Sequence, residues 1–187
     1  MNLEEKKLRS EHIFEGRVVD LWRDEVELPN GNLGVREVVR HVGAVSVLPL
    51  DSDGRVICVR QYRYPFAEIL LEIPAGKLDS KSEDVVEAAL RELREETGAV
   101  CENLISLGKL IPSCAVCDEV INMFVATGLS FGETQPDEDE FLDVVRIPLD
   151  ELVDMVMEGK IRDAKTQVSV LKVQRLIDTG KLKSVKV

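Results

Sequence analysis

The sequence predicts an α/β fold, an α/β/α sandwich in which a mixed sheet lies between helices, preceded by an N-terminal antiparallel β hairpin. Apolar runs bounded by turn residues occur before and after one amphipathic helix, and further helical patterns end the chain. The first segment instead alternates apolar and polar side chains. A length of 187 residues allows one main core and a small accessory element. We therefore predict an N-terminal β domain at residues 1–41 and a main domain at residues 42–187.

The strands are predicted from apolar runs and from the turn residues between them. The N-terminal hairpin spans residues 12–41 and turns at Pro29-Asn30-Gly31-Asn32. The segment Asp51-Ser52-Asp53-Gly54 separates the first two strands of the main domain. The strands that we predict in that domain are residues 42–50, 55–63, 68–73, 105–110, 120–126 and 142–147. The two helices that we predict at the end of the chain are residues 149–158 and 163–178.

The central helix is the best specified element. Ser80 and Glu83 form a candidate capping box, Ser82 is an alternative N-cap, and Gly98 supplies a left-handed C-terminal residue. One stripe of the helix is apolar and is expected to face the core. The residues of this stripe are Val86, Ala89, Leu90, Leu93 and Thr97.

An acidic cluster, Glu92, Glu95 and Glu96, lies on the same helix. Residues four apart on a helix are about 5–6 Å apart at Cβ, and a like-charge pair there costs roughly 0.2–0.5 kcal/mol. The cluster is either a solvated acidic face or a site for a divalent cation. Because Glu96 borders the apolar stripe, its carboxylate is partly sheltered from water, which favours the cation site.

Composition excludes some classes of function. With 35 acidic and 24 basic residues the net charge is −11, which argues against nucleic-acid binding but allows a phosphorylated ligand held through metal ions. No apolar run approaches the length of a membrane span, and the start lacks the apolar core of a signal peptide, so we expect no membrane association and a cytoplasmic protein. Cys114 and Cys117 form one Cys-x-x-Cys pair, a weak signal for zinc or redox chemistry beside the interpretation as ordinary reduced thiols.

Residues 76–100 resemble the signature of the Nudix hydrolases, which cleave nucleoside diphosphates linked to another moiety. The family pattern is Gly, five residues, Glu, seven residues, then Arg-Glu-hydrophobic-any-Glu-Glu-any-Gly-hydrophobic. The matching residues are Gly76, Glu83, Arg91, Glu92, Leu93, Glu95, Glu96, Gly98 and Ala99. Six residues separate Gly76 from Glu83 instead of five, and we expect the polar loop before the helix to absorb the extra residue.

The resemblance covers roughly residues 12–175 and extends to the ADP-ribose pyrophosphatase branch of the family. The segments that carry it are Arg36 to His41, Val59 to Arg63, Leu71 to Leu78 and Asp163 to Thr166. It implies Mg2+-dependent hydrolysis, with Mn2+ as a substitute, of ADP-ribose or a related nucleoside diphosphate sugar. The alternatives are a GDP-sugar or other dinucleotide pyrophosphatase, and a nucleotide sensor without catalysis. The resemblance also implies a homodimer in which the N-terminal hairpin helps to hold the base.

The same resemblance implies a set of metal ligands. Glu92, Glu96 and the backbone carbonyl of Ala75 match ligand positions of the family, and Glu95 is an additional candidate. Arg91 matches a position that orients a glutamate of the cluster. Several carboxylates on one rigid helix suit Mg2+, which prefers oxygen ligands and bridges to substrate phosphates.

The remaining site residues are also implied by the resemblance. Glu140 matches the base that activates water, with Glu138 as the second candidate, although a solvated acidic loop is the alternative interpretation of this segment. The expected substrate-binding residues are Glu37 for the adenine amino group, Arg63 for a phosphate, Lys77 and Ser113. Trp22 is either a packing residue or a replacement for aromatic side chains that stack on the base in relatives. The loop 113–119 lacks the Ser-Pro-Gly of relatives, which weakens the assignment to ADP-ribose more than the assignment to hydrolysis.

Overall fold

The structure, a computed structural model, describes residues 2–135 and 141–182. The chain divides into two compact units. Residues 1–42 and 111–120 form the first unit, and residues 43–110 and 121–187 form the second. The loop 111–120 thus groups with the N-terminal strands, although it lies far from them in the sequence.

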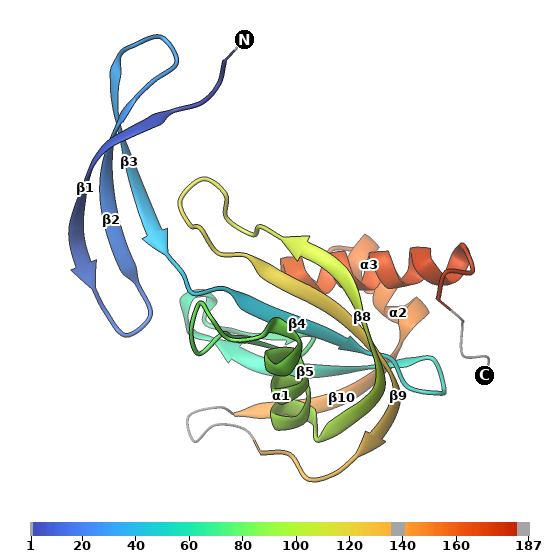
Figure 1. The fold of residues 1–187 in the computed structure, drawn as a ribbon. Coiled ribbons are helices and arrows are strands. Elements are labelled where there is room, and N and C mark those ends of the chain that lie inside the picture. Colours follow the sequence, from blue (N-terminus) through green and yellow to red (C-terminus); the bar gives the residue numbers. More distant parts are fainter. Residues whose placement is uncertain (1, 136–140, 183–187) are drawn as a thin grey trace. The chain divides into compact units, whose positions relative to one another are not determined.

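The first unit contains a three-stranded antiparallel sheet of order β1-β2-β3 (Figure 1). Its strands are β1 (Lys6–Glu15), β2 (Asp20–Glu27) and β3 (Leu33–Arg40). Strands β2 and β3 are the predicted hairpin, and Gly31 in its turn has a φ of 83°, a conformation that glycine adopts without strain. The sequence analysis did not predict β1. Every side chain of β1 is exposed, so burial imposes no apolar periodicity on its sequence.

Trp22 packs within this sheet. Its ring stacks on His12 with 4.7 Å between ring centroids. The indole Nε1 donates a hydrogen bond of 2.9 Å to Asp20 Oδ1, which also lies 2.8 Å from His12 Nε2. These local contacts support the interpretation of Trp22 as a packing residue.

The second unit is built around a four-stranded mixed sheet of order β7-β4-β9-β8. The strands are β4 (Ala44–Pro49), β7 (Ala75–Lys77), β8 (Ala99–Leu110) and β9 (Ile121–Phe131). Strand β4 runs parallel to β9 and antiparallel to β7. All six residues of β4 are buried, as expected for the central strand of a covered sheet. Strand β8 is longer than predicted and carries a register shift between Ser106 and Gly108.

A second sheet has the order β10-β5-β6 and is antiparallel. Its strands are β5 (Arg55–Arg63), β6 (Glu68–Glu72) and β10 (Leu142–Pro148). A 3-10 turn, Tyr64–Phe66, joins β5 to β6. These strands agree with the predicted segments within one or two residues.

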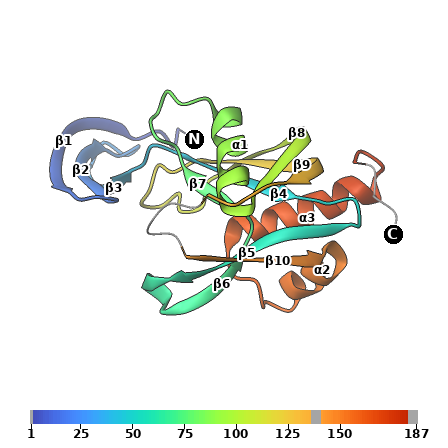
Figure 2. The same cartoon turned by 90° about the horizontal axis from the view of Figure 1, so that it is seen from below.

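Three helices complete the second unit: α1 (Val85–Thr97), α2 (Leu149–Met157) and α3 (Ala164–Asp178). Helices α1 and α3 both contact β4, and Figures 1 and 2 show them on opposite sides of this strand. The prediction of an α/β fold with a mixed sheet between helices is therefore confirmed. The fully buried aliphatic side chains of the core include Leu48, Leu50, Ile73, Leu152 and Ile161.

The start of α1 differs from the prediction. Asp84 is the N-cap, and its carboxylate accepts hydrogen bonds from the backbone N of Val86 (2.8 Å) and of Glu87 (3.1 Å). The predicted caps at Ser80 and Ser82 are therefore wrong. An aspartate directly before the first helical residue satisfies the free N–H groups of the first turn without help from the longer loop.

The buried face of α1 is also rotated from the predicted stripe. Ala89, Leu93 and Thr97 are buried as expected, but Val86 and Leu90 are 44% and 38% exposed. The buried face extends instead toward two glutamates of the acidic cluster. Because burying a carboxylate is costly unless it has partners, Glu92 and Glu96 require partners on this face.

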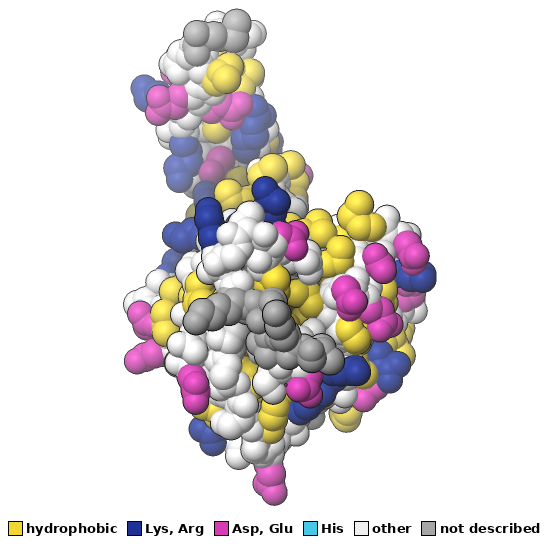
Figure 3. Space-filling view, turned by 90° about the vertical axis from the view of Figure 1, so that its right-hand side faces the viewer, with side chains coloured by type: hydrophobic (Ala, Val, Ile, Leu, Met, Phe, Trp, Pro, Cys, Tyr) yellow, Lys and Arg dark blue, Asp and Glu magenta, His cyan; other side chains and the backbone are white. Residues whose placement is uncertain are grey.

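Within the described residues, no helix combines the length and hydropathy that crossing a membrane requires. On the face shown in Figure 3, Lys and Arg side chains are interspersed with Asp and Glu.

Candidate active site

Helix α1 carries two buried glutamates into the second unit. Glu92 is 7% exposed and Glu96 is 4% exposed, and they lie one turn apart. Glu95 is more open, with 34% of its side chain exposed. Gly98 ends the helix in the left-handed conformation with a φ of 68°, so these glutamates occupy its last two turns. Helix geometry therefore places Glu92 and Glu96 on the inner face.

Strand β7 approaches this face of α1 very closely. The backbone N of Ala75 donates a hydrogen bond of 3.3 Å to Glu96 Oε2. A Cβ atom at Gly76 would lie only 2.1 Å from the carboxyl carbon of Glu92. Position 76 must therefore be glycine for the Glu92 carboxylate to keep its place against the strand.

Arg91 links three glutamates around this site. Its Nη1 donates to Glu92 Oε1 at 2.7 Å and to Glu95 Oε2 at 3.1 Å, and its Nη2 donates to Glu83 Oε1 at 3.3 Å. Burial opposes the charged form of Arg91, but the charge of Glu92 and these hydrogen bonds outweigh it and raise the pKa of Arg91. Arg91 thus holds the side chains of Glu83, Glu92 and Glu95 together.

Glu83 therefore has a role other than the predicted capping box. Its Oε2 accepts a hydrogen bond of 2.6 Å from the backbone N of Asp79, while its Oε1 faces Arg91. The residue ties the loop before α1 to the acidic cluster. The extra residue in this loop leaves the glutamate within reach of Arg91.

The donor set suits a hard divalent cation. Mg2+ keeps several waters and is held through one or two carboxylates plus substrate phosphates, so the paired Glu92 and Glu96 carboxylates fit this ion. Within residues 2–135 and 141–182, no group of three or more His, Cys, Asp and Glu side chains is arranged to enclose a metal ion.

We expect Gly76→Ala to lower metal-dependent turnover at least about tenfold, because the new methyl carbon would lie 2.1 Å from the Glu92 carboxyl carbon and force the carboxylate to move. The carboxylate is the far end of a flexible side chain, so the fold should persist. Activity at increasing Mg2+ concentrations and thermal denaturation measure the two effects. Gly132→Ala is the matched control, because its Cβ would make only an ordinary contact of 3.8 Å. Equal activities of the two variants would contradict the prediction.

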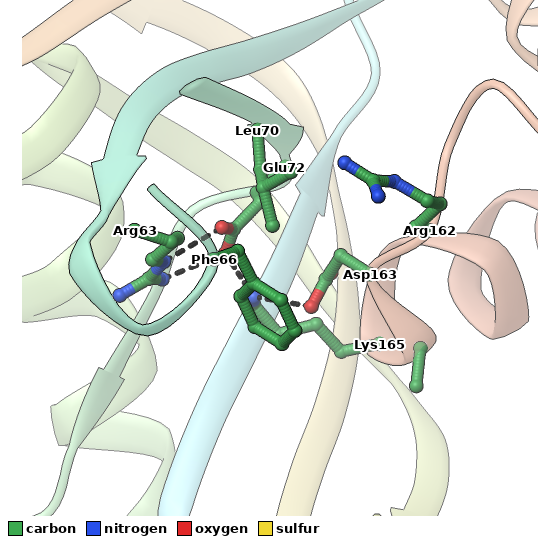
Figure 4. A pocket seen from close by; sticks show the side chains of 8 residues that line it. Arg63, Phe66, Leu70, Glu72, Arg162, Asp163 and Lys165 are labelled. Carbon is green, nitrogen blue, oxygen red and sulfur yellow. Dashed lines mark hydrogen bonds and ion pairs between the residues drawn. The ribbon is translucent and has the colours of Figure 1, made fainter. Parts of the chain in front are cut away.

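A second charged cluster lines a cavity of about 340 Å³ in the same unit (Figure 4). Arg63 donates from Nε and Nη2 to the two carboxylate oxygens of Glu72, both at 2.7 Å. Lys165 also bonds to Glu72, and its Nζ lies 3.0 Å from Asp163 Oδ1. The network joins β5, β6 and α3, and the ring of Phe66 covers part of it in Figure 4.

Charge pairing dominates the titration of this network. Burial alone would raise the pKa of Glu72, but the hydrogen bond from Arg63 and the charge of Lys165 lower it to about 2. The bond to Glu72 raises the pKa of Arg63, and the charge of Glu96 contributes in the same direction.

The other predicted site residues do not all join this cluster. Lys77 is exposed on β7, opposite Ala44 of β4. Glu37 and Ser113 are exposed and belong to the first unit, where Glu37 lines a cavity of about 550 Å³. Glu140 and Glu138 lie outside the described residues, so their roles stay predictions from the sequence.

The sequence analysis missed Glu72 and Lys165. Glu72 is 2% exposed and Lys165 is 8% exposed, so both charges are buried. The available signal was a single carboxylate in the otherwise apolar run from Leu70 to Ile73. A buried charge requires a partner, so a buried Glu72 predicts a charged or polar group from another part of the chain beside it.

The chain has a mixed α/β fold. Its helix α1 carries buried glutamates against the Ala75-Gly76 strand. These features define a class of hydrolase with a carboxylate cluster on one helix. Family models identify the class further. The model described as NUDIX domain matches residues 40–169. The model described as nucleoside diphosphate sugar hydrolase N-terminal domain matches residues 5–39. The chain therefore belongs to the Nudix family.

Three known proteins illustrate the similarity. The chain is 47% identical to a methanol dehydrogenase activator of Bacillus methanolicus, over 89% of this chain and 91% of that protein. It is 42% identical to an ADP-ribose pyrophosphatase of Bacillus subtilis, over 90% of this chain and 92% of the relative. A crystal structure of an ADP compounds hydrolase superposes with a TM-score of 0.84 at 26% identity, covering 96% and 98% of the two chains.

Proposed function

We propose that this chain hydrolyses the pyrophosphate bond of ADP-ribose or a related nucleoside diphosphate sugar, with Mg2+ as cofactor. ADP-ribose would yield AMP and ribose 5-phosphate. The observation that carries the proposal is the buried Glu92–Glu96 pair on α1, in which Glu96 accepts a hydrogen bond from Ala75 N and Glu92 accepts one from Arg91. The similarity to an ADP-ribose pyrophosphatase over most of both chains supports the substrate class.

In this proposal each residue has a defined role. Bound Mg2+ would neutralise phosphate charge and lower the pKa of a coordinated water. Glu92 and Glu96 hold the metal with the Ala75 carbonyl, and Glu95 is an additional ligand. Arg91 keeps the glutamates oriented for this task.

The substrate contacts complete the proposal. Arg63, whose Nε and Nη2 already donate to Glu72, would donate from Nη1 to a phosphate oxygen. Lys77 and Ser113 contribute further polar contacts to the substrate. Glu37 accepts from the amino group of the base.

The base that removes a proton from the attacking water is assigned to Glu140. We expect Glu140→Gln to lower turnover about 100-fold with little change in KM, because general base catalysis contributes roughly 100-fold or more. Steady-state kinetics with ADP-ribose checks this expectation, and Glu138→Gln, at the second candidate position, is measured beside it. Normal turnover in Glu140→Gln would move the role to Glu138 or Glu119.

Substrate preference is measured by AMP release. ADP-ribose should be turned over faster than GDP-sugars and dinucleotides in the presence of Mg2+ or Mn2+. Faster turnover of a GDP-sugar or dinucleotide would support pyrophosphate hydrolysis but would show that ADP-ribose is not the preferred substrate. No turnover of any compound would favour a nucleotide sensor without catalysis.

The similarity to a methanol dehydrogenase activator favours a second candidate function, the activation of an alcohol dehydrogenase. The rate of methanol oxidation by a methanol dehydrogenase, with and without this chain, tests it. Repeating the measurement with Glu96→Gln shows whether activation depends on the proposed hydrolase site. Activation that survives in this variant would separate the two functions.

We also propose a cytoplasmic homodimer formed through the first unit. Phe14 is 56% exposed, Ile13 is 48% exposed and Val35 is 47% exposed in this thin sheet. An exposed apolar sheet with so little core of its own is stabilised by a partner. We expect the wild-type protein to sediment as a dimer and Phe14→Glu to shift it toward the monomer. Leu171→Glu on α3 is the control, and a wild-type monomer would contradict the proposal.

A further inference from the structure

The four cysteines of the chain lie in two different environments. Cys58 is fully buried, and burial raises its pKa to about 12. Burial also raises the pKa of Cys101. Cys114 is exposed and Cys117 is half-buried, and both are free thiols in the loop 111–120. Because the thiolate is the reactive form, Cys58 and Cys101 are poor nucleophiles at neutral pH.

A backbone turn connects Cys114 to Cys117 in this loop. The carbonyl oxygen of Ser113 accepts hydrogen bonds from the backbone N of Val116 (3.2 Å) and of Cys117 (3.0 Å). Residues three apart on a helical turn have Cβ atoms about 5–6 Å apart. A disulfide requires a Cβ separation of about 3.5–4.5 Å. Two cysteines at the helical spacing therefore need their Cβ atoms to approach by about 1–2 Å before the sulfurs can bond.

Strand β3 holds the far end of the turn in place. Val39 forms a parallel bridge with Cys117, donating a hydrogen bond of 2.8 Å to the carbonyl of Val116 and accepting one of 3.2 Å from Asp118 N. The Asp118 carboxylate accepts a further bond of 2.6 Å from the backbone N of His41. Cys117 is therefore fixed, and the closing movement falls on the exposed Cys114.

The two thiols are open to reagents. Both line the cavity of about 550 Å³ in the first unit, together with Arg36, Glu37 and Val38 of β3. Within the described residues, none of the four cysteines is engaged in a disulfide. A fixed thiol and an exposed thiol at this spacing satisfy the geometric requirement for intramolecular thiol–disulfide exchange.

We propose that Cys114 and Cys117 form a reactive dithiol that is reversibly oxidised to a disulfide by small-molecule disulfides and that binds trivalent arsenicals. The Cys114 thiolate attacks one sulfur of the organic disulfide, forming a mixed disulfide and releasing one thiolate. The Cys117 thiolate then attacks the Cys114 sulfur, closing the intramolecular bond and releasing the second thiolate. The two cysteines lose two electrons, the reagent is reduced to two thiols, and the two cysteine protons end on these products.

The test uses the full-length protein in its native state with oxidised glutathione, followed by rapid alkylation and intact-mass and peptide analysis. We expect alkylation of Cys114 and Cys117 to disappear, the mass to fall by two hydrogens without a retained glutathione, and dithiothreitol to reverse both changes. One equivalent of phenylarsine oxide should protect the same two thiols without any oxidant, because two As–S bonds form while the arsenic-bound oxygen leaves as water with the two thiol protons. Retained glutathione on both cysteines, or two thiols that stay alkylatable in both treatments, would overturn the proposal.

Single variants separate the two steps. Cys117→Ser should keep a stable glutathione on Cys114, because the second attack is lost, and should no longer bind the arsenical. Cys101→Ser is the matched control and should behave as the wild-type protein. Thermal denaturation of each variant checks that the exposed turn is altered without unfolding. Ring closure that persists in Cys117→Ser would assign the partner thiol to another cysteine and overturn the pairing.

Discussion

Glu96→Gln is expected to lower Mg2+-dependent turnover at least about 100-fold while the protein stays folded. The amide has nearly the same shape as the carboxylate and can still accept the hydrogen bond from Ala75 N. It carries no charge, so the negative field that would hold a divalent cation beside Glu92 is weaker. The loss should appear in kcat, and the Mg2+ concentration needed for half activity should rise.

The stability of this variant supplies an independent check. Glu92 and Glu96 are buried like charges on successive turns, and removing one charge relieves repulsion within α1. We therefore expect a midpoint of thermal unfolding equal to or above that of the wild-type protein. Glu87→Gln makes the same chemical change at an exposed position in the first turn of the same helix and should leave turnover unchanged. Wild-type turnover in Glu96→Gln would show that the acidic cluster does not take part in the reaction.

The fold was predictable where burial shapes the sequence. Strand β4 is buried along its whole length, and its apolar run indicated a strand directly. Strand β1 exposes every side chain, so no periodicity marks it, and it was missed. The cap of α1 was also missed, because Ser80 and Glu83 imitate a capping box while Asp84 satisfies the helix terminus itself.

The site was predictable only where its residues are neighbours in the chain. Arg91, Glu92 and Glu96 act from one helix, so spacing alone places them together. Glu72 and Lys165 are 93 residues apart, and only the folded chain brings their charges into contact. A carboxylate in an apolar strand shows that a partner exists, but local sequence patterns do not identify that partner.

Glu72→Gln is expected to lower the free energy of unfolding at pH 7 by about 3–5 kcal/mol, the cost of breaking a buried ion pair by removing one partner. The change leaves the guanidinium of Arg63 without its bidentate carboxylate. It leaves the buried Lys165 with Asp163 as its remaining partner in this network. Urea unfolding of both proteins at several pH values measures the difference.

The pH dependence of that difference follows from the lowered pKa of Glu72. The carboxylate has a pKa of about 2 in the folded chain, below its ordinary value of 4.5. Its stabilisation is therefore fully present above about pH 4.5 and is lost as the pH falls through about 2. The wild-type and variant free energies should converge across this window.

The exposed ion pair between Glu68 and Arg162 provides the matched control for Glu72. Glu68 lies on the same strand, and the two side chains of this pair are 51% and 54% exposed. Solvent screening limits such a pair to about 0–1 kcal/mol, so Glu68→Gln should change stability little at any pH. A loss below about 1 kcal/mol in Glu72→Gln, equal to that of the control, would mean that relaxation or water replaces the buried carboxylate. A pH-independent difference would instead assign the loss to packing rather than to the charge of Glu72.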